Sequence, residues 1–138
     1  MHYIVYTDGG SRGNPWIAGC GIYITDGLWK AIEKRYHSLG VSTNNIAEYT
    51  AVKEGIARAI ALGARSIEVK ADSLLVVKQL SWEYKVKNTA LKYIYDTIQW
   101  MLKKWWGTIS FTHIYRENNK EADRLANKAM DESVRTNT

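Results

Sequence analysis

The chain has 138 residues, a length that suits one domain able to bury a sizeable core. No apolar stretch approaches the roughly 18 residues that span a bilayer, no signal peptide is visible, and a lone Cys20 excludes an intramolecular disulfide. These features predict a cytoplasmic protein with no membrane partner. Nineteen lysines and arginines against 14 aspartates and glutamates leave a net charge of +5, which indicates either a polyanionic partner or simply a solvated basic surface.

The first part of the chain has the pattern of β-strands. Residues 2–8 alternate and are rich in β-forming side chains, so they predict a strand that ends in a glycine-rich turn. Residues 19–25 and 29–38 predict two further strands joined at Asp26 and Gly27, a dipeptide that favours a hairpin. The simplest arrangement is three antiparallel strands in sequence.

From Thr43 the apolar period becomes helical, and Gly63 ends the pattern. The later elements mix both periods; in chain order they are a strand over 66–71, a helix over 73–81, a helix from Asn88 or Thr89 to about Lys104, a strand over 108–115 and a helix after Asn118 and Asn119. The order βββαβααβα predicts an α/β protein with a mixed sheet covered by helices. Without a repeat or linker, residues 1–138 should form a single domain, with the polar residues 131–138 as a frayed tail.

Four acidic residues stand at predicted strand ends or in the first turns of predicted helices: Asp8, Glu48, Asp72 and Asp123. Such positions can converge in an α/β fold, and converging carboxylates repel one another unless a cation joins them. The pattern therefore predicts a divalent-metal catalytic site. Caps, turns and surface charge are the simpler explanations; Asp123, for example, would complement the dipole of its helix.

The four carboxylates lie in four distinctive blocks: residues 7–15 (TDGGSRGNP), 43–48 (TNNIAE), 71–73 (ADS) and 116–127 (RENNKEADRLAN). Together these blocks resemble the signature of the type 1 ribonuclease H family, the last one in the form common in archaeal and plant-type members. The resemblance runs from Tyr3 to about Met130. It implies a ribonuclease H-like fold with a five-stranded mixed sheet of order 3-2-1-4-5, flanked by helices.

The resemblance also implies an activity and its cofactors. Asp8, Glu48, Asp72 and Asp123 match the catalytic residues that bind two Mg²⁺ ions in the family, with Mn²⁺ as a possible substitute. The implied reaction is endonucleolytic hydrolysis of the RNA strand in RNA–DNA hybrids, giving 5′-phosphate and 3′-hydroxyl ends, by a protein expected to be monomeric. The alternatives are a nuclease of broader specificity, acting for example on double-stranded RNA, and a non-catalytic binding module of the same fold.

A second set of residues matches family positions that contact the substrate: Gly9, Gly10, Gly13, Asn14, Thr43, Asn44, Asn45 and Arg116. Possible DNA-strand contacts lie between the second and third helices: Trp82, Tyr84, Lys85 and Lys87. Each group also has a plainer explanation. The glycines suit a turn, the asparagines suit helix capping, the aromatic residues suit packing, and the lysines suit a solvated loop.

The chain departs from the family pattern in three places. The loop before the last helix has no histidine, so Arg116 is the candidate for phosphate contact there, and His113 is expected to be structural. The basic helix that many bacterial members insert after the second helix is missing, which predicts weaker hybrid binding. Leu74 occupies the position of a frequent glutamine, which puts one minor-groove contact and some RNA/DNA discrimination in doubt.

Overall fold

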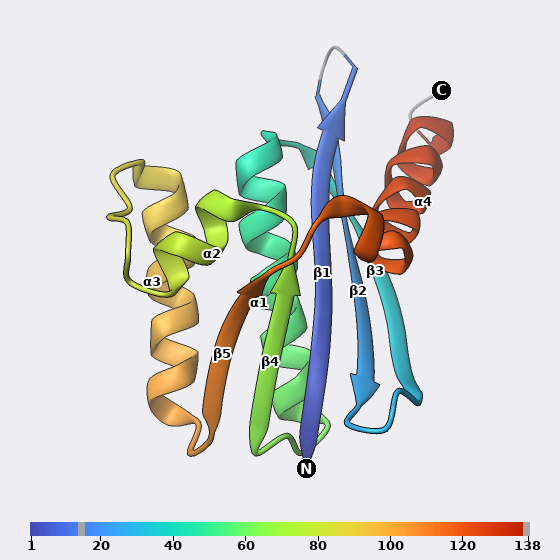
Figure 1. The fold of residues 1–138 in the computed structure, drawn as a ribbon. Helices are drawn as coiled ribbons and strands as arrows, with labels where there is room; N and C mark the ends of the chain where they lie inside the picture. The colour runs from blue at the N-terminus through green and yellow to red at the C-terminus, as the bar shows by residue number, and fades with distance from the viewer. Residues whose placement is uncertain (14–15, 137–138) are drawn as a thin grey trace.

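The computed structural model describes residues 1–13 and 16–136, with side chains through residue 133. Within these residues the predicted order βββαβααβα is confirmed, with one short 3₁₀ helix added before the last α-helix (Figure 1). The strands are β1 (His2–Arg12), β2 (Ile17–Asp26), β3 (Ala31–Val41), β4 (Ser66–Ala71) and β5 (Thr108–His113). The helices are α1 (Asn44–Ala61), α2 (Leu74–Leu80), α3 (Thr89–Lys104), η1 (Arg116–Asn118) and α4 (Lys120–Thr136).

The strands form one sheet in the predicted order β3-β2-β1-β4-β5. β1 is central: it pairs antiparallel with β2 and parallel with β4, whose Ala71 lies beside Thr7. β3 and β5 form the two edges, antiparallel to β2 and parallel to β4 respectively. Because β1 and β4 run in the same direction, Asp8 and Asp72, which follow Thr7 and Ala71, lie at the same level of the sheet.

Helices cover both faces of the sheet (Figure 1). Neighbouring residues of β2 show this, since Gly21 meets the backbone of α4 at Ala122 whereas Ile22 packs near Gly55 of α1. α3 packs beside α1, and both help to bury one large cluster of apolar side chains. Fully buried members of that cluster include Val5, Ile22, Val52, Ile56, Val69 and Ile98. This cluster fixes α1 against the central strand and so places Glu48 near the end of β1.

The first hairpin forms where the Asp-Gly dipeptide predicts it. Asp26 closes the loop, because its Oδ1 accepts hydrogen bonds from the backbone amides of Leu28 and Lys30, both at 2.8 Å. The two strands run longer than predicted, to residues 17–26 and 31–41. In this hairpin the dipeptide marked the place of the turn, and the side chain of Asp26 sets its length.

β1 continues through Gly9 and Gly10 to Arg12, although the sequence predicts a turn from residue 9. Gly9 is needed for close packing rather than for a turn: a Cβ there would lie 2.2 Å from the carbonyl oxygen of Ala47 in α1. The strand ends at Arg12, and the next residue, Gly13, has a φ of 83°, in the left-handed region that favours glycine. The glycine-rich block therefore extends the central strand past the start of α1.

Helix α4 runs to Thr136, so residues 131–136, expected to fray, are helical; residues 137 and 138 lie outside the described part. Two contacts explain the extension. Arg12 forms an ion pair with Asp131 at 2.7 Å, and the Tyr36 hydroxyl donates to Glu132 at 3.0 Å. The end of α4 is thus held by β1 and β3. Across the described residues, no helix combines the length and apolar character needed to cross a bilayer.

Candidate active site

All four predicted carboxylates line one open cleft of about 270 Å³. Four different elements supply them: Asp8 belongs to β1, Glu48 to the second turn of α1, Asp72 to the end of β4, and Asp123 to the first turn of α4. The remaining lining residues are Gly9, Gly10, Ser11, Arg12, Asn44, Arg116, Asn127 and Met130. The fold therefore brings together residues separated by more than 100 positions in the chain.

Asp8 has the most perturbed carboxyl group in the cleft. Its pKa is raised from 3.8 to about 8, first because burial penalises the charged form and then because Asp72, Asp123 and Glu48 repel its charge. A hydrogen bond with Asp123 adds to the shift. All three other carboxylates thus act on Asp8, which makes it the electrostatic centre of the site.

The pKa of Glu48 is also raised, but less than that of Asp8. Its pKa is raised from 4.5 to about 7, first because burial penalises the charged form and also because the charge of Asp72 repels it. Hydrogen bonds from Ser73 and Asn44 oppose the shift by stabilising the charged form; the amide of Asn44 lies 3.4 Å from Glu48 Oε1. Two of the four carboxyl groups are therefore costly to ionise near neutral pH unless positive charge enters the cleft.

Neutral amides and one arginine contact the carboxylates of Asp72 and Asp123. Asn119 Nδ2 donates to Asp72 Oδ2 at 3.2 Å, and Asn127 Nδ2 donates to Asp123 Oδ1 at 3.3 Å. Arg116 Nη2 lies 3.6 Å from Asp123 Oδ1, with 78% of the Arg116 side chain exposed. Because that guanidinium faces solvent, it can turn from Asp123 to a phosphate without losing buried contacts.

The donor set fits hard divalent cations, because carboxylate oxygens are the ligands that Mg²⁺ and Mn²⁺ prefer. Since burial and neighbouring carboxylates raise the pKa values of Asp8 and Glu48, a cation beside these two groups would favour their charged forms. Among the described residues, however, no three His, Cys, Asp or Glu side chains are arranged to hold one metal ion by themselves. The assignment of metal ligands stays a prediction.

The predicted substrate-contacting residues divide into three groups. Gly9, Gly10, Asn44 and Arg116 line the cleft. Thr43, Asn45 and Gly13 do not line it, and Asn14 lies outside the described residues. The capping explanation belongs to Thr43 alone, whose hydroxyl accepts from the amide of Ile46 at 3.2 Å, so the exposed Asn44 and Asn45 are free of that role.

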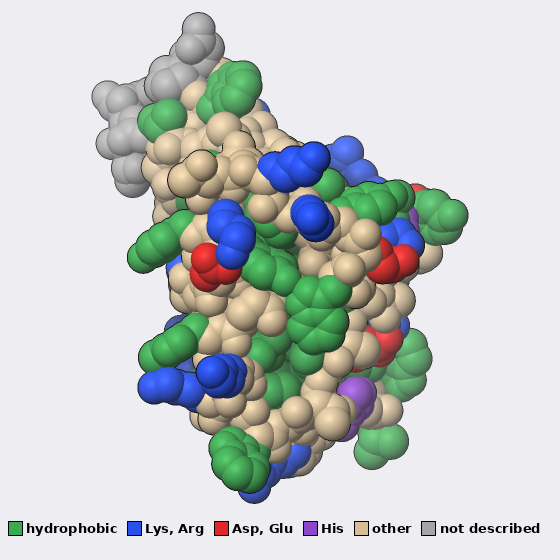
Figure 2. All heavy atoms as spheres, turned by 90° about the vertical axis from the view of Figure 1, so that its left-hand side faces the viewer, with side chains coloured by type: hydrophobic (Ala, Val, Ile, Leu, Met, Phe, Trp, Pro, Cys, Tyr) green, Lys and Arg blue, Asp and Glu red, His purple; other side chains and the backbone are tan. Residues whose placement is uncertain are grey.

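The loop between α2 and α3 exposes the other candidate residues. Trp82 is 74% exposed and Tyr84 52% exposed, so the packing explanation is wrong for Trp82. Lys85 and Lys87 are exposed as well. On the face built by α2 and α3, Lys and Arg side chains are spread among exposed hydrophobic ones, and acidic side chains are sparse (Figure 2). This face has the composition of a surface for a polyanion.

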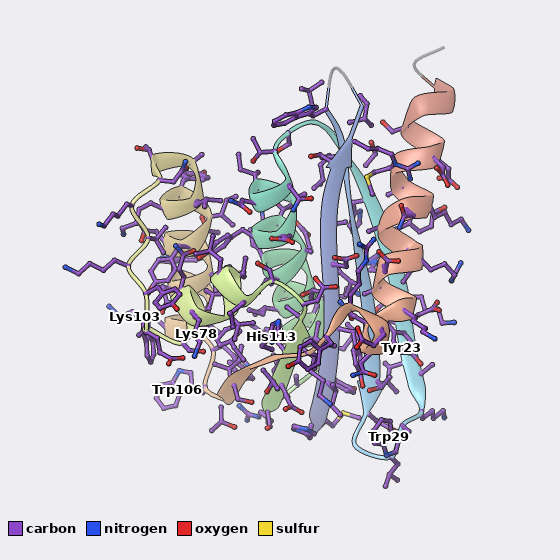
Figure 3. All side chains as sticks on the ribbon, turned by 45° about the horizontal axis from the view of Figure 1, so that its top comes forward. Tyr23, Trp29, Lys78, Lys103, Trp106 and His113 are labelled. Carbon is purple, nitrogen blue, oxygen red and sulfur yellow. The ribbon has the colours of Figure 1, made fainter. Side chains whose placement is uncertain are left out.

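Two of the three departures from the family pattern, Leu74 and the loop without a histidine, also have structural counterparts. Leu74, at 48% exposure, begins α2 directly after Asp72 and Ser73 and offers no polar group there. His113 ends β5 and packs edge-on against Tyr115, with 5.7 Å between ring centroids (Figure 3). His113 does not line the acidic cleft, in keeping with the structural role predicted for it.

Sequence reasoning missed three polar residues around the cleft: Arg12, Asn119 and Asn127. Arg12 Nη2 donates to the carbonyl oxygen of Asn127 at 2.9 Å, so it ties the end of β1 to α4. Asn119 is buried beside Asp72. All three lie within the blocks 7–15 and 116–127, but only their contacts across the sheet reveal what they do.

An open α/β sheet of order 3-2-1-4-5 with carboxylates from β1, α1, β4 and α4 in one cleft defines the ribonuclease H-like class of proteins. The reverse transcriptase-like family model matches residues 7–129. A ribonuclease H of Clostridium botulinum is 32% identical over 149 aligned positions, which cover 94% of this chain and 95% of that protein. The chain therefore belongs to the ribonuclease H family, as its four blocks predict.

Two further comparisons agree. A bifunctional protein of Mycobacterium tuberculosis is 38% identical over 99% of this chain, which spans only 37% of that protein. The structure of its N-terminal RNase H domain superposes with a TM-score of 0.93 at 36% identity, covering 99% of both chains. LC11-RNase H1, solved in complex with an RNA/DNA hybrid, has a TM-score of 0.91 at 37% identity and covers 96% of this chain and 99% of its own.

Proposed function

We propose that this domain hydrolyses the RNA strand of RNA–DNA hybrids with two divalent cations, Mg²⁺ or Mn²⁺, leaving 5′-phosphate and 3′-hydroxyl ends. The observation that carries the proposal is the convergence of Asp8, Glu48, Asp72 and Asp123 on one open cleft, where burial and the neighbouring carboxylates raise the pKa of Asp8 to about 8. The kinship with ribonucleases H, one of them solved with an RNA/DNA hybrid, supports the choice of substrate.

The chemistry explains why an acidic cleft suits a polyanionic substrate. Two bound cations would activate the attacking water and stabilise the departing 3′ oxygen. Asp8 would help to hold both ions, because it lies on the central strand β1 among the other three carboxylates. The resemblance to the family implies that Glu48 and Asp72 would hold the ion on the side of the attacking water, and Asp123 the other. Arg116 would orient the substrate by contacting a phosphate oxygen from its exposed position beside Asp123.

Substrate choice would depend on groups around the acidic centre. Asn44 lines the cleft and presents an amide able to pair with a 2′-hydroxyl, which can both donate and accept hydrogen bonds. The exposed loop with Trp82, Tyr84, Lys85 and Lys87 would receive the DNA strand through stacking and phosphate contacts. Leu74 offers no polar group beside Asp72, so one minor-groove contact and part of the discrimination between RNA and DNA should be lost.

The test is cleavage of an end-labelled RNA–DNA hybrid with Mg²⁺, with Mn²⁺ and with a chelator. We expect metal-dependent internal cuts in the RNA strand and products that a ligase accepts at the 5′-phosphate. Parallel reactions with RNA and DNA duplexes measure specificity. Salt-sensitive hybrid binding without any turnover would instead show a non-catalytic binding module, and faster cleavage of an RNA duplex would reassign the substrate.

Trp82→Ala should raise the KM for hybrid about fivefold or more and leave kcat nearly unchanged, because one lost stacking contact costs about 1–3 kcal/mol. Trp106→Ala is the matched control. Trp106 is 88% exposed but precedes β5, so it lies at the end of that strand opposite to Arg116 and the acidic cleft (Figure 3). Steady-state kinetics of both variants decide the point. Equal KM values for the two variants would remove Trp82 from the substrate surface.

A further inference from the structure

Asn119, between η1 and α4, is the most deeply buried polar side chain near the cleft. Only 1% of the residue is exposed. Its side-chain nitrogen Nδ2 donates to the carbonyl oxygen of Thr7 at 2.9 Å and to Asp72 Oδ2 at 3.2 Å. Its own carbonyl oxygen accepts from the backbone amide of Asp123 at 3.0 Å. One residue thus contacts the three chain segments that supply Asp8, Asp72 and Asp123.

The neighbours of Asn119 fix the orientation of its amide group. Thr7 O and the Asp72 carboxylate are both acceptors, so the NH₂ group must face them and Oδ1 must point away. Within the described residues Oδ1 has no hydrogen-bond partner, so no competing donor favours the flipped amide. Both hydrogens of the NH₂ group are then committed, one to the central strand and the other to a carboxylate of the cleft.

These contacts restrain two distances at once. The bond to Thr7 O fixes Asn119 against the residue that directly precedes Asp8, and the bond to Asp72 fixes that carboxylate against the same amide. The backbone bond from Asp123 then ties the first turn of α4 to this point. Because carboxylates in this cleft repel one another, a neutral donor that contacts their supports can hold them together without adding charge.

We propose that Asn119 is a positioning residue that sets Asp72 relative to Asp8 and Asp123, so that three carboxylates from β1, β4 and α4 present one pre-arranged set. The proposal rests on the proposed ribonuclease function of the cleft. A purely structural role, that of holding the loop between β5 and α4 in place, is the competing explanation. The two differ in what they predict for turnover in a folded variant.

Asn119→Asp and Asn119→Ala test the proposal, with Asn118→Asp and Asn118→Ala as matched controls. The aspartate variant keeps the shape of the side chain but places an acceptor against two acceptors, whereas the alanine variant removes both bonds. Asn118 is the neighbouring, exposed asparagine and lies outside the acidic cleft. Circular dichroism and the unfolding midpoint first establish which variants are folded at the assay temperature.

We expect kcat on the hybrid to fall at least about tenfold in the folded Asn119 variants, with KM within about twofold of wild type, since positioning of the carboxylates is lost and the binding surface is kept. Both Asn118 variants should stay within about twofold in kcat. A folded Asn119 variant with wild-type kcat would overturn the proposal. The proposal would also be overturned if kcat fell by the same factor in the Asn119 variant and in the corresponding Asn118 variant.

A second readout needs neither activity nor metal. In ¹H–¹⁵N spectra of the metal-free wild type, the side-chain NH₂ protons of Asn119 should exchange with solvent far more slowly than those of the exposed Asn118. In Asn119→Asp, backbone shifts should concentrate at Asp8, Asp72 and Asp123. Rapid exchange of the wild-type protons would overturn the proposal even if no variant folds. If wild type cleaves no hybrid, the proposed function fails while these spectra still decide the positioning.

Discussion

Asp8→Asn should lower the rate of hybrid cleavage at least about 1,000-fold and, at the same time, make the metal-free protein more stable. The loss of rate follows because the one carboxylate near all three others is assigned to both cations. The gain in stability follows because the amide removes a partly buried charge from a cleft that already holds three acids. An active-site substitution that stabilises the fold is the signature of a site built from like charges.

The pH dependence of the unfolding free energy shows in which direction Asp8→Asn changes the stability. The folded-state pKa of Asp8, about 8, lies above its ordinary value of 3.8, so its contribution to stability is fully present below about pH 4 and is lost as the pH rises toward 8. Asparagine does not titrate in this range. The difference in unfolding free energy between Asp8→Asn and wild type should therefore grow from pH 4 to pH 8, to about 1–3 kcal/mol.

Denaturant unfolding in a chelator at several pH values measures that difference, and the cleavage assay with Mg²⁺ measures the rate. Asp96→Asn is the control, because Asp96 lies on α3, pairs with Lys92 at the surface and is absent from the cleft. Asp96→Asn should change neither the unfolding free energy nor the rate of hybrid cleavage by much. Full cleavage by Asp8→Asn, or a stability difference that shrinks toward pH 8, would contradict the assignment of Asp8.

The carboxylates could be found from the sequence because each stands beside a local signal. Asp8 and Asp72 follow apolar runs that are recognisable as strands, and Glu48 follows a clear helix start at Thr43. The resemblance of the surrounding blocks then supplied the strand order. Short-range patterns locate strand ends and helix starts well, and in an α/β sheet those are the places where side chains converge.

The supporting residues could not be found in the same way. Asn119 next to Asn118 looks like another helix-start asparagine, yet one is buried against β1 and β4 while the other is exposed. Arg12 looks like one more surface cation until its bonds to Asn127 and Asp131 in α4 are seen. Such roles depend on contacts between segments that are at least 47 residues apart, for which local pattern and composition carry no signal.

Gly9→Ala should destabilise the protein by about 3 kcal/mol or more, whereas Gly10→Ala should leave its stability nearly unchanged. A Cβ at Gly9 would lie 2.2 Å from the carbonyl oxygen of Ala47, so backbone must move and α1 must separate from β1. A Cβ at Gly10 would meet only side-chain atoms at ordinary contact distances, 3.4 Å from Asn44 Oδ1 and 3.5 Å from Met130 Cε. Thermal unfolding of both variants measures this contrast.

These two neighbouring glycines therefore separate helix packing, which only the structure reveals at Gly9, from the substrate approach predicted for both residues. Gly10 lines the cleft, so its methyl group should raise the KM for hybrid several-fold in a protein that unfolds like wild type. Gly9→Ala should lose more activity than its loss of folded protein accounts for, mainly in kcat, because α1 carries Glu48 away from Asp8 when it shifts. A stable Gly9→Ala that binds hybrid poorly would show instead that substrate approach, not helix packing, requires that glycine.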